Sequence, residues 1–255
     1  MHTWRATMTD AWLDDVADGL WRRGAGPPPF PRDMEAAAMD AGLPVFFVPI
    51  PGLTVEKAEA WIARRHGAFR FLCPARALRG CIIAVRGEAA IFTDPDDGSD
   101  ERRFTEAHEL PHFLCDYERP RQNALAAFGS VIRPVLDGDR LPTPVECVHA
   151  ALAGVPLGAY TDLMGRDETG GVGLADALGA ELRADRLAFH LLAPLDAVFA
   201  CLPGVPGETE RNAFGRMVVD VLCRDFGLPG WAAREYGRRL WAERSRPDSR
   251  GWLGL

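Results

Sequence analysis

The sequence predicts an α+β fold, with a small β-sheet followed by a mainly helical second half. Segments rich in β-branched and aromatic residues lie between residues 43 and 93, whereas helical spacing of apolar residues prevails from Glu101 onward. Strands followed by helices are the order typical of an α+β domain. The 255 residues are 47% hydrophobic and 25% charged, which suits one large domain or two small ones with a core that needs no disulfides.

The elements of the first half follow from local sequence signals. A run rich in glycine and proline at residues 24–31 ends the first helix and forms a stiff connector. Residues of high β-propensity flank Arg86-Gly87-Glu88 and indicate a β-hairpin. The predicted elements are a helix capped by Thr9 or Asp10, a short helix over Met34–Ala41, a buried strand over Leu43–Ile50, a helix from Thr54 through Arg65, and the hairpin strands Cys81–Val85 and Ala89–Thr93.

The second half is predicted to be helical, and three regions result. We expect an N-terminal helical extension over residues 1–42, a central domain over residues 43–200 with a helical insert at about 120–167, and a C-terminal helical region over residues 201–255. The predicted helices of this half are Glu101–Asp116, Arg121–Leu136, Pro144–Leu152, Leu174–Leu192, Glu208–Phe226 and Trp231–Arg244.

Charge, cysteine content and apolar runs exclude several classes of protein. The net charge is −7, so global electrostatics do not recruit nucleic acid, which we do not expect as a partner. The longest apolar runs fall far short of the roughly 20 residues of a membrane span, and the N-terminus lacks a signal-peptide pattern. The six cysteines contain no C-x-x-C pair, as is typical of reduced thiols. We therefore expect a cytoplasmic protein with no membrane partner.

The strongest chemical signal is the segment His108-Glu109-Leu-Pro-His112. Two histidines at i and i+4 lie on one helix face, about 6 Å apart along the axis, so both imidazoles can reach one metal ion. Glu109 then lies beside the metal, where it can take a proton from a metal-bound water. The alternative is a pair of surface histidines. Apolar residues surround the motif, however, and a buried imidazole pair without a partner would be costly.

A third ligand is predicted on a later helix. A catalytic zinc ion, Zn²⁺, needs three protein ligands and one open position. Glu181 shares a helix face with Asp185, so we expect Glu181 to bind the metal and Asp185 to accept a hydrogen bond from a ligand imidazole. The alternative is a helix start whose acidic residues favour the macrodipole. Glu146, with His149 nearby, is a competing ligand, unless the two form an ordinary surface pair.

Two segments together with the hairpin resemble the ImmA/IrrE metallopeptidases. The segments are Arg102-Arg103-Phe104-Thr105-x-Ala107-His108-Glu109-Leu110-x-His112 and Glu181-x-x-Ala184-Asp185-x-x-Ala188-x-x-Leu191-Leu192-x-Pro194. The similarity covers roughly residues 43–194 and implies a zincin-like domain with an active-site helix and a glutamate helix. It also implies a cytosolic zinc endopeptidase of the gluzincin type, with His108, His112 and Glu181 on the metal and Glu109 as the catalytic base. The substrate it implies is a helix-turn-helix repressor, cleaved in a stress or mobile-element response.

Two departures from the family pattern carry expectations of their own. Pro111 stands where the family usually has glycine, and a proline inside a helix predicts a kink between the two histidines, at a cost of about 3 kcal/mol in an ordinary helix. The insert forms either a wall of the substrate cleft, or a partner surface, or structural padding. Within and before it, Tyr160 and Tyr117 are the candidates for stabilising the oxyanion of the transition state.

A function of a different class remains open at the C-terminus. The predicted helices Asn212–Arg224 and Trp231–Arg244 can form a helix-turn-helix whose arginines contact DNA phosphates. The alternative is that these helices pack on the catalytic domain and that their arginines are solvated. The competing hypothesis is therefore a transcription regulator or protein-binding module in which the metal site is only structural.

Overall fold

A four-stranded sheet lies at the centre of the computed structural model, which describes residues 11–66, 69–71, 73–165, 175–202 and 211–244. The strand order is β1-β3-β2-β4. Strand β1 runs parallel to β3, while β2 is antiparallel to both β3 and β4. The strands are β1 (Val45–Pro49), β2 (Leu78–Val85), β3 (Glu88–Thr93) and β4 (Tyr160–Gly165).

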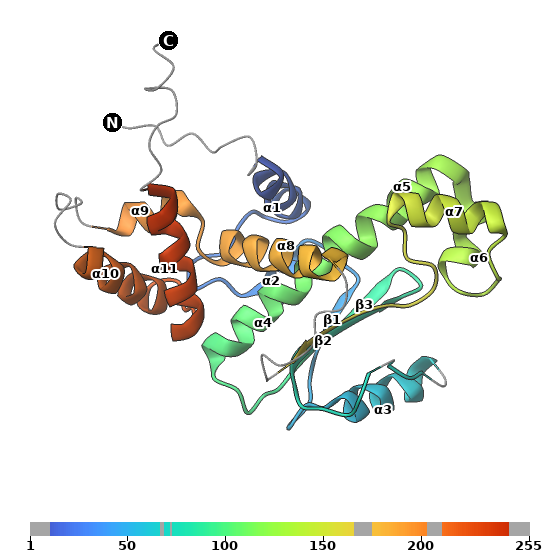
Figure 1. Ribbon diagram of the computed structural model, residues 1–255, viewed down its shortest axis with the longest axis horizontal. Coiled ribbons are helices and arrows are strands. Elements are labelled where there is room, and N and C mark those ends of the chain that lie inside the picture. The colour runs from blue at the N-terminus through green and yellow to red at the C-terminus, as the bar shows by residue number, and fades with distance from the viewer. Residues whose placement is uncertain (1–10, 67–68, 72, 166–174, 203–210, 245–255) are drawn as a thin grey trace, which may run out of the picture.

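Helices cover both faces of the sheet and build two separate cores. Helix α3 (Val55–His66) lies on one face and α4 (Ser99–Pro111) on the other (Figure 1). Because successive side chains of a strand point to opposite faces, Ile83 and Phe92 join the core under α3, whereas Ile82 and Ile91 join the larger core under α4. The α+β class predicted from the sequence is confirmed at this level.

The larger core is closed by helices from both ends of the chain. Helix α8 packs along α4, and α1 and α2 pack against α8 and α4 respectively. The C-terminal helices lie at one end of the molecule and the insert helices at the opposite end (Figure 1). The bounds are α1 (Ala11–Arg23), α2 (Met34–Asp40), α8 (Ala175–Leu192), α9 (Leu195–Cys201), α10 (Arg211–Arg224) and α11 (Gly230–Arg244).

The helix that carries the histidine motif changes its winding at Pro111. Helix α4 ends there and continues without a break as a π-helix, η1 (His112–Glu118), in which the Arg119 amide donates to the carbonyl of Leu114, five residues back. Proline has no amide hydrogen and crowds the preceding turn, and such sites are where helices bend or change winding. The irregularity predicted between the histidines is therefore a change of winding in a continuous helix.

The insert forms a small helical unit beyond η1. Its helices are α5 (Arg119–Phe128), the 3₁₀ turn η2 (Gly129–Ile132), α6 (Arg133–Leu136) and α7 (Pro144–Ala153). Ala124, Ile132, Val135 and Leu136 form a core of their own. The segment after α7 joins the sheet as strand β4, which pairs with β2.

Three predicted elements need correction. The strand predicted as buried is β1, an edge strand in which Phe46 is 56% exposed. The helix predicted over Arg121–Leu136 is interrupted at Gly129, whose φ of 72° lies in the left-handed region that ends an α-helix. The insert, predicted as helical throughout, contains strand β4, because Tyr160–Gly165 pairs with β2.

Some predicted positions lie outside the described residues: the caps Thr9 and Asp10, Leu174, and Glu208. Among the helices that the structure describes, none combines the length and the apolar composition needed to cross a bilayer.

Candidate metal centre

The two histidines of the motif converge in the interior of the protein. His108 lies in the last turn of α4 and His112 is the first residue of η1. Their side chains are only 2% and 0% exposed, and their ring centroids are 5.3 Å apart. Neither Nε2 atom has a hydrogen-bond partner among the described residues. Since buried polar atoms are nearly always hydrogen-bonded, these two nitrogens point to a missing ligand.

Two carboxylates from other elements complete the cluster. Glu181 of α8 places Oε2 3.3 Å from His108 Nε2 and Oε1 3.7 Å from His112 Nε2. Asp162 of β4 places Oδ2 3.6 Å from His112 Nε2. One donor atom from each of the four side chains lies within 4.8 Å of the others. These four residues can hold a metal ion.

Each histidine is oriented by a second carboxylate on its other ring nitrogen. His108 Nδ1 lies 3.0 Å from Asp185 Oδ1, and His112 Nδ1 lies 3.0 Å from Asp116 Oδ2. Such contacts fix the tautomer, so that Nε2 is left as the lone-pair donor to a metal. Each carboxylate in turn meets an arginine: Arg239 Nη2 is 3.6 Å from Asp185 Oδ2, and Arg183 Nη2 is 3.0 Å from Asp116 Oδ1.

Glu109 lies beside the cluster with both carboxylate oxygens unpartnered. The residue is fully buried, and neither Oε1 nor Oε2 has a hydrogen-bond partner among the described residues. Gly80 of β2 makes room for it, because a Cβ at that position would collide with Thr105 and lie 3.3 Å from Glu109 Oε1. Burial, and then the charge of Asp162, raise the pKa of Glu109 to about 8.

The electrostatics of the cluster call for a cation. Burial disfavours a charged His108, but the nearby carboxylates of Asp185 and Glu181 outweigh burial and raise its pKa to about 10. Burial raises the pKa of Asp162 to about 6. Buried carboxylates that lack enough positive partners are costly, and a divalent ion satisfies them together with the orphaned imidazole nitrogens. The residues present therefore fit a metal ion.

The structure brings together the residues predicted as ligands and separates them from their competitors. His108, His112, Glu181 and Asp185 all meet at this cluster. Glu146 instead pairs with Arg140 and closes a capping box with Thr143. The other candidates also lie elsewhere: His149 stacks on Phe128, and Tyr117 Oη accepts a hydrogen bond from the Gly87 amide.

Tyr160 lies on the outer side of one histidine. Its hydroxyl is 3.2 Å from His112 Nδ1, the nitrogen that also contacts Asp116. This contact helps to hold the ring of His112. Stabilisation of an oxyanion by Tyr160 stays a prediction.

Two residues of the site were missed by the sequence reasoning. Asp116 follows His112 by four residues, a spacing that places both on one helix face, and this signal was available. Asp162 was read as part of a helical insert. Residues 160–164 (Tyr-Thr-Asp-Leu-Met) show no alternation of apolar and polar side chains, so only the pairing with β2 places Asp162 on the face of the histidines.

Helix α11 packs on the protein through its apolar residues, and two of its arginines pair with acidic residues. Helix α11 buries Ala232, Ala233 and Leu240 in the large core. Arg238 and Arg239 both pair with Glu235 of the same helix, and Arg239 also reaches Asp185. The packing of this helix agrees with the packing alternative, and contact with DNA stays untested.

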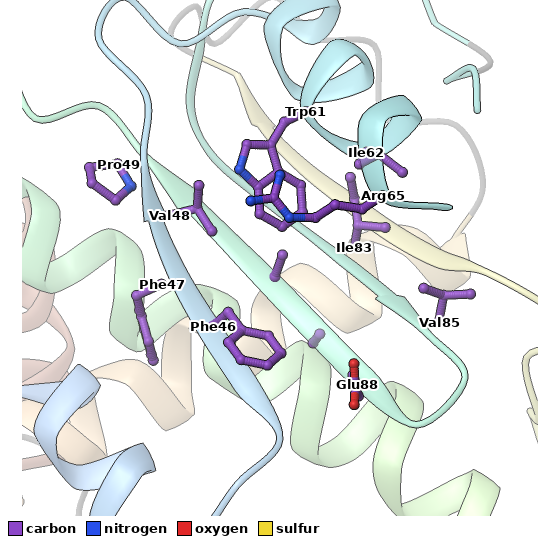
Figure 2. A pocket seen from close by; sticks show the side chains of 12 residues that line it. Phe46, Phe47, Val48, Pro49, Trp61, Ile62, Arg65, Ile83, Val85 and Glu88 are labelled. Carbon is purple, nitrogen blue, oxygen red and sulfur yellow. The ribbon is translucent and has the colours of Figure 1, made fainter. Parts of the chain in front are cut away.

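Two cavities lie on different sides of the sheet. One of about 680 Å³ is lined by Asp116, Tyr160 and Arg183 together with Ala150 and Pro156 of the insert, so it opens beside the cluster. The other, of about 570 Å³, lies on the α3 face, where Trp61 and Arg65 reach over the strands toward Phe46 (Figure 2). Its lining is apolar except for Arg65 and Glu88.

Comparisons of the chain with protein families, with curated proteins and with solved structures found no match, so the functional argument rests on the geometry and chemistry of this cluster.

Proposed function

We propose that this chain is a zinc-dependent endopeptidase that hydrolyses a peptide bond in a protein substrate. The observation that supports it best is the carboxylate of Glu109, which is buried without a partner beside two imidazole nitrogens that also lack partners. A structural metal site has no use for an unpartnered carboxylate at its edge, whereas hydrolysis needs a base there. The resemblance to ImmA/IrrE peptidases adds the expected substrate class, a helix-turn-helix repressor.

Zinc is the metal that suits the donor set. Imidazole nitrogens and carboxylate oxygens are both common zinc ligands, and two histidines with a glutamate are a known catalytic combination. His108, His112 and Glu181 would hold the ion. Asp185 and Asp116 would keep the two imidazoles in the tautomer that binds it.

The chain's own residues then account for the proton transfers. When bound, zinc supplies a Lewis acid that polarises the scissile carbonyl and acidifies water. Glu109 takes a proton from the attacking water on its carboxylate and returns it to the leaving amine. Burial raises the pKa of Glu109 to about 8 in the metal-free cluster, and a bound divalent cation would lower it, so that the carboxylate is ionised and can accept the proton. The cavity lined by Asp116, Tyr160 and Arg183 lies beside the cluster and is the place where we expect the substrate to bind.

The test is cleavage of a proteome-derived peptide library by the zinc-loaded protein, with products mapped by mass spectrometry. Glu109→Gln keeps the shape of the side chain but cannot accept the proton, so we expect turnover to fall by about 10²- to 10⁴-fold at an unchanged zinc content of one ion per chain. The matched control is Glu88→Gln, at an exposed position of the hairpin. A Glu109→Gln variant that cleaves at the wild-type rate would contradict the proposal, as would a wild-type protein that binds no zinc.

A further inference from the structure

Asp162 reaches the cluster from the sheet, whereas the other three donors lie on helices. It lies in β4 directly opposite Ile82 of β2, and directly opposed residues of an antiparallel pair share a face. Ile82 belongs to the core under α4, so the register alone directs Asp162 toward the histidines. Its Oδ2 atom is buried and has no hydrogen-bond partner among the described residues.

We propose that Asp162 is a fourth protein ligand of the metal ion and that it closes the coordination position which hydrolysis needs open. This proposal concerns the regulation of the site and rests on the proposed function. The metal-loaded protein is latent as long as the carboxylate of Asp162 stays in the cluster. It becomes active when β4 carries that carboxylate away.

The separations between donor atoms support four-ligand binding. Donors placed about 2.0–2.2 Å from a tetrahedral zinc ion lie about 3.3–3.6 Å from one another. The observed separations are 3.3 Å between His108 and Glu181, 3.6 Å between His112 and Asp162, and 3.7 Å between His112 and Glu181. Catalytic zinc sites keep one position free of protein, whereas closed sites with four protein ligands are structural. Three of the six donor separations therefore lie at or near the tetrahedral range, and all four donor atoms lie within 4.8 Å of one another, which supports a closed site.

The two carboxylates differ in how firmly the fold holds them. Glu181 approaches both histidines, and its helix packs on α4 through the buried residues Ala184, Leu187 and Ala188. Asp162 approaches only His112 among the two imidazoles. Its strand β4 is paired with β2 along one edge alone, and a register shift interrupts that pairing. Asp162 is therefore the ligand that can leave while the other three stay.

The experiment reads the coordination of the metal directly. Wild-type protein, Asp162→Ala and Asp162→Asn are loaded with Co²⁺, whose visible absorption reports ligand number, and are then titrated with thiocyanate. We expect no spectral change in the wild type and a saturable change in both variants, because only they have a position free for the anion. The matched control is Thr161→Ala, the exposed neighbour whose side chain points to the other face of β4. It should behave like the wild type.

Affinity for Zn²⁺ alone, measured against a competing chelator, gives a second readout. Residues that only orient a metal ligand already cost about 10- to 100-fold in affinity when mutated, so Asp162→Ala should weaken Zn²⁺ binding by at least about 10-fold, and peptide cleavage at saturating zinc should rise. A wild-type Co²⁺ spectrum that responds to thiocyanate, or an unchanged affinity in Asp162→Ala, overturns the proposal. Four-ligand coordination without peptide cleavage by any variant would instead refute the proposed function and leave Asp162 as a ligand of a structural site.

Discussion

The two faces of the central sheet differ in the polar groups that are buried against them. The face under α3 is apolar, with Leu53, Ile83 and Phe92 buried against one another. The face under α4 holds two imidazoles and the carboxylate of Glu109, all buried with polar atoms unpartnered. Apolar burial stabilises a fold, whereas unpaired buried polar atoms destabilise it. The difference indicates that the core under α3 serves stability alone, whereas the α4 face combines the larger apolar core with a binding site that lowers stability.

The largest expected effect is on the apolar face. Phe92 is fully buried and meets Trp61 edge to face, with ring centroids 5.1 Å apart. Phe92→Ala should lower the free energy of unfolding by about 3–5 kcal/mol, as is typical of a buried aromatic residue replaced by alanine, while the zinc affinity of the folded protein stays close to that of the wild type. Urea unfolding and a chelator competition measure the two quantities.

The control for that variant is Phe46→Ala. Phe46 lies on the same face but is 56% exposed, so its loss should cost less than about 1 kcal/mol. If the two variants lose the same free energy of unfolding, burial is not what makes the α3 face stabilising. A large loss of zinc affinity in Phe92→Ala would show that the two faces are coupled.

The next effect belongs to the polar face. Glu181→Ala removes an oxygen donor that lies near both imidazoles, so we expect zinc affinity to fall by more than about 100-fold, beyond the loss seen for residues that merely orient a ligand. The metal-free protein should keep its stability within about 1 kcal/mol, because Glu181 is 40% exposed.

Glu146→Ala is the matched variant for Glu181→Ala. Glu146 is a glutamate on a second helix, bound to Arg140 and to the Thr143 amide away from the cluster, and its replacement should leave zinc affinity unchanged. Isothermal titration with zinc on both variants decides between the two glutamates. If Glu146→Ala loses zinc affinity and Glu181→Ala keeps it, the third ligand is Glu146 of the insert.

The smallest expected effect tests whether a partly buried carboxylate of α4 outside the metal cluster also lowers the stability of the fold. Burial, and then the charges of Asp33 and Glu35, raise the pKa of Glu106 to about 7 from an ordinary value of 4.5. An acid whose pKa is raised by folding destabilises the folded state above that pKa, and the penalty disappears as the pH falls below the unfolded value. Glu106→Gln should therefore be more stable than the wild type by about 1–2 kcal/mol at pH 8.5.

The pH dependence of the stability difference between Glu106→Gln and the wild type checks this prediction. At pH 4 the carboxyl is protonated in both states, so the variant and the wild type should unfold at nearly the same denaturant concentration. Both measurements need a chelator, so that metal binding does not contribute. A stability difference that is the same at both pH values would show that Glu106 is not titrating between its folded and unfolded values.

The helices and the ligand motif could be predicted from the sequence because both depend on the spacing of nearby residues. The histidines at i and i+4, and Glu181 with Asp185 one turn later, are spacings along a single helix. Asp162 could not be placed in the same way, since its position depends on the pairing of β4 with a strand some 80 residues earlier in the chain. The exposure of β1 was missed for a similar reason: an edge strand and a central strand have the same local pattern.

Helix α8 contributes a partner to each of the two histidines. Within two turns it presents Glu181 to both imidazoles, Asp185 to His108, and Arg183 to the carboxylate that holds His112. A shift of this one helix therefore takes Glu181 away from both imidazoles and Asp185 away from His108, while Asp116 and Tyr160 still hold the ring of His112. A metal ion held by Glu181 together with the two histidines would therefore favour the packing of α8 against α4.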